Sequence, residues 1–185
     1  MKTFMGFALA LMLSSPAIAM DVDVYTTYQS YESKSGETMD EFALRLSPDV
    51  YKITQDTGFE ACAVIAQHPD GRFGATLTSS QSYVGCILRY EIVPEGFVAT
   101  NFSIHSHPDA STPRNSDSSM DGKLNKAMGR SATAQAQGHG RRGLARPNGN
   151  GFSPADFDAG FGYLVTAKTV LFQEGRGTVR RIGRF

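Results

Sequence analysis

The sequence predicts a single domain that combines α-helix with several β-strands. Its 185 residues are a typical length for one domain, and an apolar fraction of 41 % is sufficient for one hydrophobic core. One early segment has apolar residues at helical spacing, whereas the later apolar runs are short and end at turn signals. We therefore expect one mixed domain without internal repeats.

The helical segment is ETMDEFALRL, residues 37–46. It places Met39, Phe42, Ala43 and Leu46 at helical spacing behind an acidic first turn, which predicts an amphipathic helix. The residues just before it, through Gly36, read as a polar stretch.

Turn signals in the sequence mark the boundaries of the expected strands. Residues 60–67 pair with 72–78 across the HPDG turn, 82–93 pair with 96–107 across Pro94-Glu95-Gly96, and 162–183 form strand segments around turns near 167–168 and 175–177. His68, in the HPDG turn, is expected to be exposed.

The N-terminus reads as a secretory signal peptide over residues 1–19. A lysine precedes an apolar run at 4–13, and the pattern Ala17-Ile18-Ala19, with small residues at its first and last positions, predicts cleavage after Ala19. The run is too short to span a bilayer, although a short membrane anchor is the alternative. A lipid anchor is not expected, because no cysteine lies near the cleavage site. We expect the mature domain, residues 20–185, to be periplasmic or secreted and to have no stable membrane anchor.

The chain has two cysteines, Cys62 and Cys86. In an oxidising compartment they can pair and close a loop of about 25 residues, which the loop-entropy model values at roughly 3.5 kcal/mol. The alternative is two reduced thiols, because Cys62 lies in an apolar run where cysteine behaves as a small hydrophobe. Two cysteines without a CxxC pattern argue against a thiolate zinc site.

The formal net charge is zero, which gives no reason to expect nucleic acid or a membrane surface as a partner. Arginines nevertheless cluster in two segments: Arg141, Arg142 and Arg146, and Arg176, Arg180, Arg181 and Arg184. We interpret both clusters as solvated basic loops. A groove for an acidic substrate is the alternative.

Residues 109–152 differ from the rest of the chain, because they contain few large apolar groups and many Gly, Ser, Asn and Arg. Such a segment buries too little surface to offset its ordering entropy, which predicts a mobile loop. A short helix at 121–128 is an option within it. His139, flanked by glycines, is expected to be exposed.

The first motif with metal-binding chemistry is His105-Ser106-His107-Pro108. In a strand, side chains two apart share a face, so His105 and His107 should point the same way. Two neutral imidazoles held side by side suit zinc, which takes two or three nitrogen or oxygen ligands and keeps an open position for water. The pair can also be a chance spacing, and a third ligand must come from elsewhere.

A candidate third ligand lies in Ser153-Pro154-Ala155-Asp156. Ser153 followed by proline and by an acid at the third helical position is typical of a helix start. The same rigid turn would hold the Ser153 hydroxyl and the Asp156 carboxylate at a fixed separation near a metal. The two interpretations are compatible. On a helix Asp158 would point away from Asp156, so at most one of them should face the metal.

Proton transfer needs a further group. Glu60 begins the apolar run EACAVIA, where an ordinary strand would begin with a neutral residue. Zinc lowers the pKa of water to about 7, and a carboxylate just outside the coordination sphere can take the proton and pass it to a leaving amine. The alternative for Glu60 is an exposed glutamate at a strand end.

The order of these motifs resembles the JAMM or MPN metalloprotease family. Glu60 leads a small-residue strand, HSHP follows at 105–108 and SPAD at 153–156, as in the family pattern of a glutamate, HxHP and SxxD. The resemblance covers roughly Glu37 to Gly183. Here residues 109–152 form a long insert between two motifs that are usually close, and this insert would hang over the site as a lid, a substrate-selecting loop or an inhibitory plug.

The resemblance implies a fold and a site. The fold would be α/β (α+β), a curved mixed β-sheet flanked by helices, MPN/JAB-like and thus cytidine-deaminase-like. His105, His107 and Asp156 would bind one zinc ion, Glu60 would be the general acid and base, and Ser153 would help to stabilise the oxyanion.

The implied activity is zinc-dependent hydrolysis of a peptide, isopeptide or related amide bond in a peptide or protein substrate. Better-known members act on ubiquitin or on small carrier proteins in the cytosol, and the signal peptide argues against those substrates. The alternative is an inactive MPN-like binding module that uses the insert and the tail as its contact surface. A third interpretation is a disulfide-bonded domain in which HSHP and SPAD are unrelated.

Overall fold

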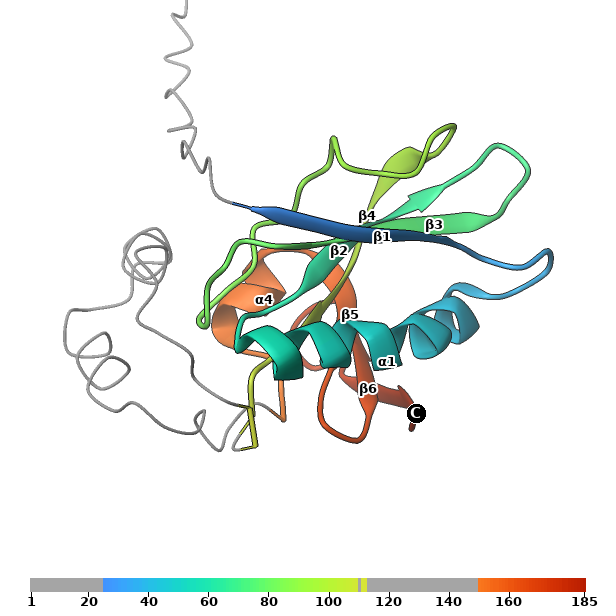
Figure 1. Ribbon diagram of the computed structural model, residues 1–185. Coiled ribbons are helices and arrows are strands. Elements are labelled where there is room, and N and C mark those ends of the chain that lie inside the picture. Colours follow the sequence, from blue (N-terminus) through green and yellow to red (C-terminus); the bar gives the residue numbers. More distant parts are fainter. Residues whose placement is uncertain (1–24, 110, 113–149) are drawn as a thin grey trace, which may run out of the picture.

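The computed structural model describes residues 25–109, 111–112 and 150–185, which form a seven-stranded sheet and two helices (Figure 1). In chain order the elements are β1 (Thr26–Glu32), α1 (Met39–Thr57), β2 (Cys62–Gln67), β3 (Phe73–Ser79), β4 (Val98–Ser106), α4 (Pro154–Asp158), β5 (Phe161–Val165), β6 (Val170–Gln173) and β7 (Arg180–Gly183). The expected signal peptide, most of the expected insert, its helix at 121–128, His139 and the arginine cluster at 141–146 lie outside the described residues. Neither described helix is long and apolar enough to cross a membrane.

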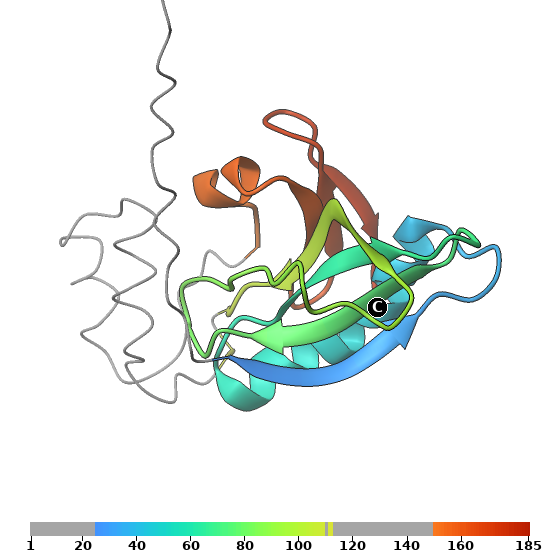
Figure 2. The ribbon, with the colours of Figure 1, turned by 90° about the horizontal axis from the view of Figure 1, so that it is seen from above.

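The strands form one mixed sheet in the order β1-β3-β2-β4-β5-β6-β7. All neighbours are antiparallel except β4 and β5, which run parallel. Figure 2 shows the sheet from above. Parallel neighbours need a long crossover connection, and here it runs from the HSHP motif through the insert to α4. The predicted combination of helices with a mixed sheet is confirmed.

The two faces of the sheet meet different helices. On one face, Phe42 and Leu46 of α1 lie in the same buried core as Ile104 of β4. Because side chains alternate along a strand, His105 lies on the opposite face. There the carboxylate of Asp156, from α4, is 3.4 Å from the His105 ring. The sheet therefore separates the hydrophobic core from the candidate site.

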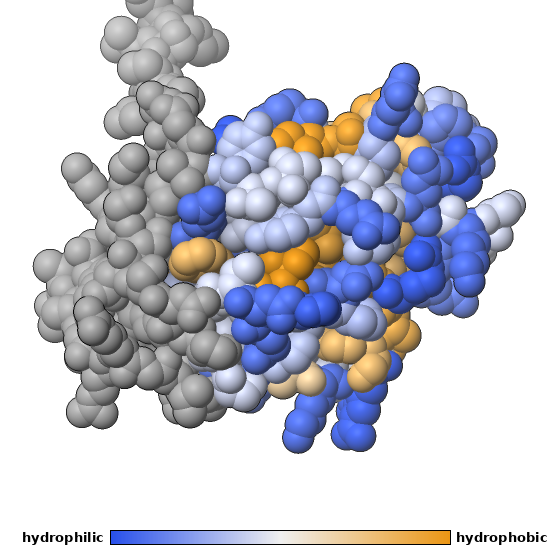
Figure 3. Space-filling view, viewed as in Figure 1, coloured by the Kyte–Doolittle hydropathy of each residue, from blue (hydrophilic) through white to orange (hydrophobic). Residues whose placement is uncertain are grey.

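Helix α1 is amphipathic, as the sequence predicts. It begins with a capping box, in which Thr38 Oγ1 accepts a hydrogen bond from the Glu41 N–H and the Glu41 carboxylate accepts one from the Thr38 N–H. In Figure 3, hydrophilic side chains cover much of the outer side of the molecule, and hydrophobic residues show between them.

The predicted helix stops before Pro48, whereas α1 continues to Thr57, so the expected end was wrong. Pro48 cannot donate a hydrogen bond to the Leu44 carbonyl, which weakens a helix at that point. Val50 and Thr54 nevertheless continue the fully buried stripe, and packing of this stripe on the sheet offsets the lost bond. Gly58, with φ of 75°, ends the helix in the left-handed conformation.

Strand β1 falls in the segment that was expected to be a polar stretch. Tyr28 and Tyr31 both pack against the core, although they are three residues apart rather than two. The pairing with β3 gains one residue between Thr27 and Ser30, which is a β-bulge. The bulge interrupts the alternation, so the strand has no clear signal in the sequence.

The strand expected at 82–93 is absent, since this part of the described chain forms turns and irregular structure. Strand β2 already has β3 and β4 as neighbours, and β3 has β1 on its other side. Serine side chains pair with the backbone of the segment instead: Ser80 Oγ with the Ile87 N–H at 2.9 Å, and Ser82 Oγ with the Val84 N–H at 3.2 Å. The prediction for this segment was wrong.

The other expected turns and strands are confirmed. The HPDG turn joins β2 and β3, with Gly71 at φ of 92°, and the Phe97 N–H donates to the Pro94 carbonyl before β4. The C-terminal segment forms β5, β6 and β7. His68 is half-buried rather than exposed, because its ring packs against Phe97 with centroids 5.1 Å apart.

A cluster of polar side chains connects the start of α1 to strands β5 and β7. Tyr163 Oη donates to Asp40 at 2.7 Å, and Arg180 donates to the same carboxylate at 2.8 and 3.1 Å. The hydrogen bond from Arg180, assisted by that from Tyr163, holds the pKa of Asp40 below its usual value despite partial burial. Burial, together with Asp40, raises the pKa of Tyr163.

Asp40→Asn should lower the free energy of unfolding at pH 7 by roughly 1 kcal/mol, a value discounted for solvent because the Asp40 side chain is 37 % exposed. A lowered folded-state pKa stabilises the protein fully above the unfolded-state value and ceases to do so as pH falls through the folded-state value. Urea unfolding should therefore show wild type and variant converging below about pH 4. Asp56→Asn, near the other end of α1, is the control, and a pH-independent difference would contradict the assignment.

Candidate metal centre

The end of β4 presents two histidines to the same face of the sheet, as the sequence predicts. His105 is the penultimate residue of β4, and His107 follows the strand. Their Nε2 atoms are 3.2 Å apart, and their side chains are 14 % and 13 % exposed. The imidazoles therefore lie side by side in a largely shielded position.

Asp156 completes a group of three ligand-type side chains. Its Oδ1 is 3.4 Å from His105 Nε2, and its Oδ2 is 3.4 Å from His107 Nε2. One ligand atom from each of the three residues can be chosen so that all lie within 4.8 Å of one another. The two motifs that were identified separately in the sequence thus meet in the structure.

The helix start at Ser153 holds Asp156 in this position. Ser153 Oγ accepts a hydrogen bond from the Asp156 N–H at 3.4 Å, and Asp156 Oδ2 accepts one from the Ser153 N–H at 2.5 Å. This capping box, with Pro154 in the first helical turn, matches the predicted helix start. Asp156 therefore caps α4 and faces the histidines at the same time.

The separations within the group suit a metal ion. Charge-assisted hydrogen bonds between imidazolium and carboxylate are about 2.7–2.9 Å long, shorter than the contacts seen here. Two ligands about 2.05 Å from a tetrahedral zinc ion lie about 3.3 Å apart. Two imidazole nitrogens and a carboxylate oxygen, all ligand atoms that zinc accepts, converge on one place. The donor set thus fits a cation such as zinc.

The electrostatics of Asp156 agree with this view. Burial acts to raise its pKa, but the interactions with His105 and His107 outweigh burial and hold the pKa well below the usual value for an aspartate. The carboxylate is therefore ionised and available as a ligand.

Glu60 is buried, with 6 % exposure, and the alternative of an exposed strand-end glutamate was wrong. Cys62 pairs with His105 across β2 and β4, and the Ser106 N–H donates to the Ala61 carbonyl at 2.9 Å. The same register extended by one residue places Glu60 opposite His107. Residues opposite one another in antiparallel strands have their side chains on the same face, so the Glu60 side chain leaves the backbone on the face that carries the site.

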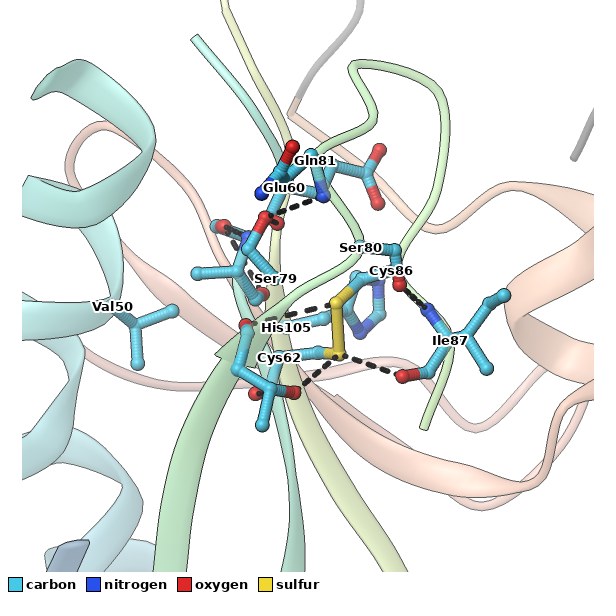
Figure 4. The surroundings of a disulfide bond; sticks show 12 residues. Val50, Glu60, Cys62, Ser79, Ser80, Gln81, Cys86, Ile87 and His105 are labelled. Carbon is cyan, nitrogen blue, oxygen red and sulfur yellow. Dashed lines mark hydrogen bonds between the residues drawn. A yellow bond between two sulfur atoms is a disulfide. The ribbon is translucent and has the colours of Figure 1, made fainter. Parts of the chain in front are cut away.

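A disulfide joins Cys62 and Cys86, with sulfurs 2.10 Å apart, and the predicted pairing is confirmed. Cys62 is directly opposite His105, so the disulfide lies next to the candidate site (Figure 4). It holds the segment after β3 beside the start of β2, where the Glu60 N–H also donates to the Ser82 carbonyl at 2.8 Å. A disulfide is typical of an oxidising, non-cytoplasmic compartment.

Ser106, between the two histidines, was not identified from the sequence. It is fully buried, its Oγ lies 2.5 Å from Thr54 Oγ1 of α1, and it accepts a hydrogen bond from the Ala61 N–H at 3.0 Å. These contacts fix the strand end from the core side. The available signal was the alternation of side chains along the strand, which places the Ser106 hydroxyl on the core face.

Asp109 secures the chain just after the histidines and was also missed. It is 7 % exposed and accepts hydrogen bonds from Tyr51 Oη at 2.9 Å and from the Ser111 N–H at 2.7 Å. Burial acts to raise its pKa, but these hydrogen bonds hold the pKa below the usual value. The first residues of the crossover are thus tied to α1.

Asp158 does not join the group. Its carboxylate is 72 % exposed and pairs with Arg176 at 3.0 Å, as helix geometry predicts for a residue two positions after Asp156. Arg180 pairs with Asp40. These two tail arginines therefore form exposed ion pairs, although Arg180 lies in strand β7 rather than in the solvated basic loop that was expected.

No protein-family model, curated protein or solved structure matches this chain. The residues of the site therefore carry the functional argument.

Proposed function

We propose that this chain is a zinc-dependent hydrolase that cleaves a peptide, isopeptide or related amide bond, and that it belongs to the JAMM or MPN metalloproteases with an MPN/JAB-like fold. One observation carries the proposal: His105 and His107, from the start of the crossover, and Asp156, from its end, converge on one face of the sheet. The side chain of the buried Glu60 starts on the same face. The family order of glutamate, HxHP and SxxD supports it.

The ligand set favours a catalytic over a structural role for the metal. Structural zinc sites are closed by four protein ligands, whereas catalytic sites have three and keep one position open. Within the described residues, three ligand-type side chains are grouped. When bound, zinc would supply a Lewis acid that lowers the pKa of a water molecule and polarises an amide carbonyl.

The remaining groups would move protons and stabilise charge. Glu60 would accept the proton of the attacking water and deliver it to the leaving nitrogen, as a general base and then a general acid. Ser153 Oγ acts as an acceptor towards the Asp156 N–H, which leaves its own proton available for a carbonyl oxygen that becomes negative.

The proposed setting is the periplasm or the exterior of the cell, with a peptide or protein as substrate. The disulfide supports a non-cytoplasmic location, and the N-terminal sequence has the features of a signal peptide. The cytosolic ubiquitin-like and carrier-protein substrates of better-known family members do not fit this setting.

Metal content and turnover test the proposal. Residues 20–185, purified without chelator, should contain about one zinc ion per chain, and the ion should be lost in His105→Ala/His107→Ala but kept in His68→Ala. Zinc-loaded protein should release amines from members of a panel of peptide and isopeptide substrates, and a chelator should stop the release reversibly.

Absence of metal after reconstitution with zinc would reject the hydrolase. Partner binding that survives the double histidine replacement would then favour an inactive binding module. Stoichiometric zinc without turnover on any amide would retain the metal site and reject the reaction.

A further inference from the structure

Gln173 is a fully buried polar residue on the face of the sheet that carries the site. It is 1 % exposed, at the end of β6. It pairs with Gly162 of β5, which in turn pairs with Ser103 of β4, two residues before His105. Alternation along β4 places Ser103 and His105 on the same face, so Gln173 lies on that face as well. A buried amide is costly unless its hydrogen bonds are made.

The Gln173 amide makes hydrogen bonds with two separate segments. Its Nε2 donates to the Asp156 carbonyl at 3.3 Å and to the Gly160 carbonyl, which are the backbone groups of α4 and of the residues just after it. Its Oε1 accepts from the Gly175 N–H at 2.6 Å, in the turn that follows β6. The side chain thus joins the sheet to the helix that carries Asp156.

The side chains of helix α4 make their contacts from positions that are not buried: the Phe157 ring packs against Phe152 with centroids 5.7 Å apart, and the Arg176 guanidinium lies over the same ring. The helix spans five residues, and none of them is buried. A helix of this length is not stable alone, so its placement depends on contacts with the rest of the chain. The Arg176–Asp158 ion pair is exposed on both sides, and such pairs contribute little. The capping box at Ser153 is internal to the segment, so it fixes the shape of α4 but not its place on the sheet.

We propose that Gln173 is the positioning residue of the metal site: by binding the carbonyls of Asp156 and Gly160, it holds the Asp156 carboxylate against His105 and His107. This inference rests on the metal site of the proposed function but not on the reaction. The hydrogen bonds of Gln173 described above go to backbone groups and not to a ligand atom, and Gln173 is outside the three sequence motifs. It acts through the backbone of the residue whose side chain is the third ligand.

The test is the zinc affinity of the folded chain, measured by competition with a chromogenic chelator. Gln173→Met keeps the length of the side chain but removes all three hydrogen bonds, and it should weaken zinc binding about 10–100-fold, as is usual for residues that orient a ligand. Gln173→Asn keeps the amide but shortens the side chain by one methylene, so it should also weaken zinc binding. It replaces Gln173→Met as the test if the methionine variant does not fold.

Tyr163→Phe is the matched control. It removes a buried hydrogen bond, to Asp40, from the core-facing side of the sheet. It should lower stability and leave zinc affinity within about twofold, because sites without shared partners act independently.

A double-mutant cycle with Asp156→Asn separates positioning from a general loss of stability. With Asp156 already impaired as a ligand, Gln173→Met should have little further effect on zinc affinity. Equal effects in both backgrounds, unchanged affinity in the single variant, or a wild type that binds no zinc would each overturn the inference. Zinc binding that depends on Gln173, without turnover, would uphold it and reject the proposed reaction.

Discussion

Glu60→Gln should reduce kcat about 10²–10⁴-fold while zinc content stays at the wild-type level. Glutamine has the size and most of the hydrogen-bonding capacity of glutamate, but it cannot accept the proton of the attacking water. Glu60 is 6 % exposed, so a replacement of the same size also avoids leaving a cavity at this buried position. The measurement is steady-state turnover of the best amide substrate, with metal content determined on the same sample.

The control for this variant is Glu95→Gln, an exposed glutamate in the turn before β4. It should leave both zinc content and kcat unchanged. Turnover in Glu60→Gln close to that of wild type would show that another group transfers the proton. Loss of zinc together with turnover would instead assign Glu60 to the coordination of the metal.

Loss of the disulfide should lower the free energy of unfolding by about 3.5 kcal/mol, since the bond closes a loop with a sequence separation of 24. A loss of this size is a large part of the stability of a typical domain. Cys62→Ala/Cys86→Ala should show the effect in urea unfolding at 25 °C. Wild type treated with a dithiol reductant should approach the same value.

The contrary outcome for the disulfide is a loss below about 1 kcal/mol, which would mean that the reduced chain keeps the segment after β3 in place without the bond. Such a result would assign the stability of this segment to its backbone contacts, among them the bond from the Ile87 N–H to Ser80 Oγ. Reduced and double-variant proteins that differ from one another would indicate that Cys62 contributes through packing as well.

The residues of the site could be grouped from the sequence because each motif is local. Alternation along a strand predicts that His105 and His107 share a face, and the capping pattern predicts where Asp156 lies in its helix. Periodicity gives no distance between the two segments, and it was the family order that suggested they meet. The structure brings the Asp156 carboxylate to 3.4 Å from the Nε2 atom of each histidine.

The elements that sequence reasoning missed depend on distant contacts. Strand β1 alternates around a bulge that is defined by its pairing with β3. The segment 82–93 has the composition of a strand, but the neighbouring positions in the sheet are already taken. Helix α1 continues through Pro48 because the buried stripe beyond it packs on the sheet.

Ser106 and Gln173 were missed for a related reason. A local pattern can show that a side chain is buried, but not what it meets. The partners of Ser106 come from α1 and from the start of β2, and those of Gln173 come from α4 and the turn after β6. Apart from Gly175, which lies two residues after Gln173, the partners named here are distant in sequence from the residue that they hold.

The parallel pairing of β4 and β5 has a consequence for the chain between them. Two prospective ligands come from the beginning of this crossover and the third from its end, so a bound ion would act as a reversible crosslink that closes one large loop. The entropic contribution to the free energy of closing a flexible loop rises by only about 0.6 kcal/mol for each doubling of the loop length. The intervening residues could thus be lengthened, shortened or exchanged at small thermodynamic cost, while the ligand geometry stays with the two anchored ends.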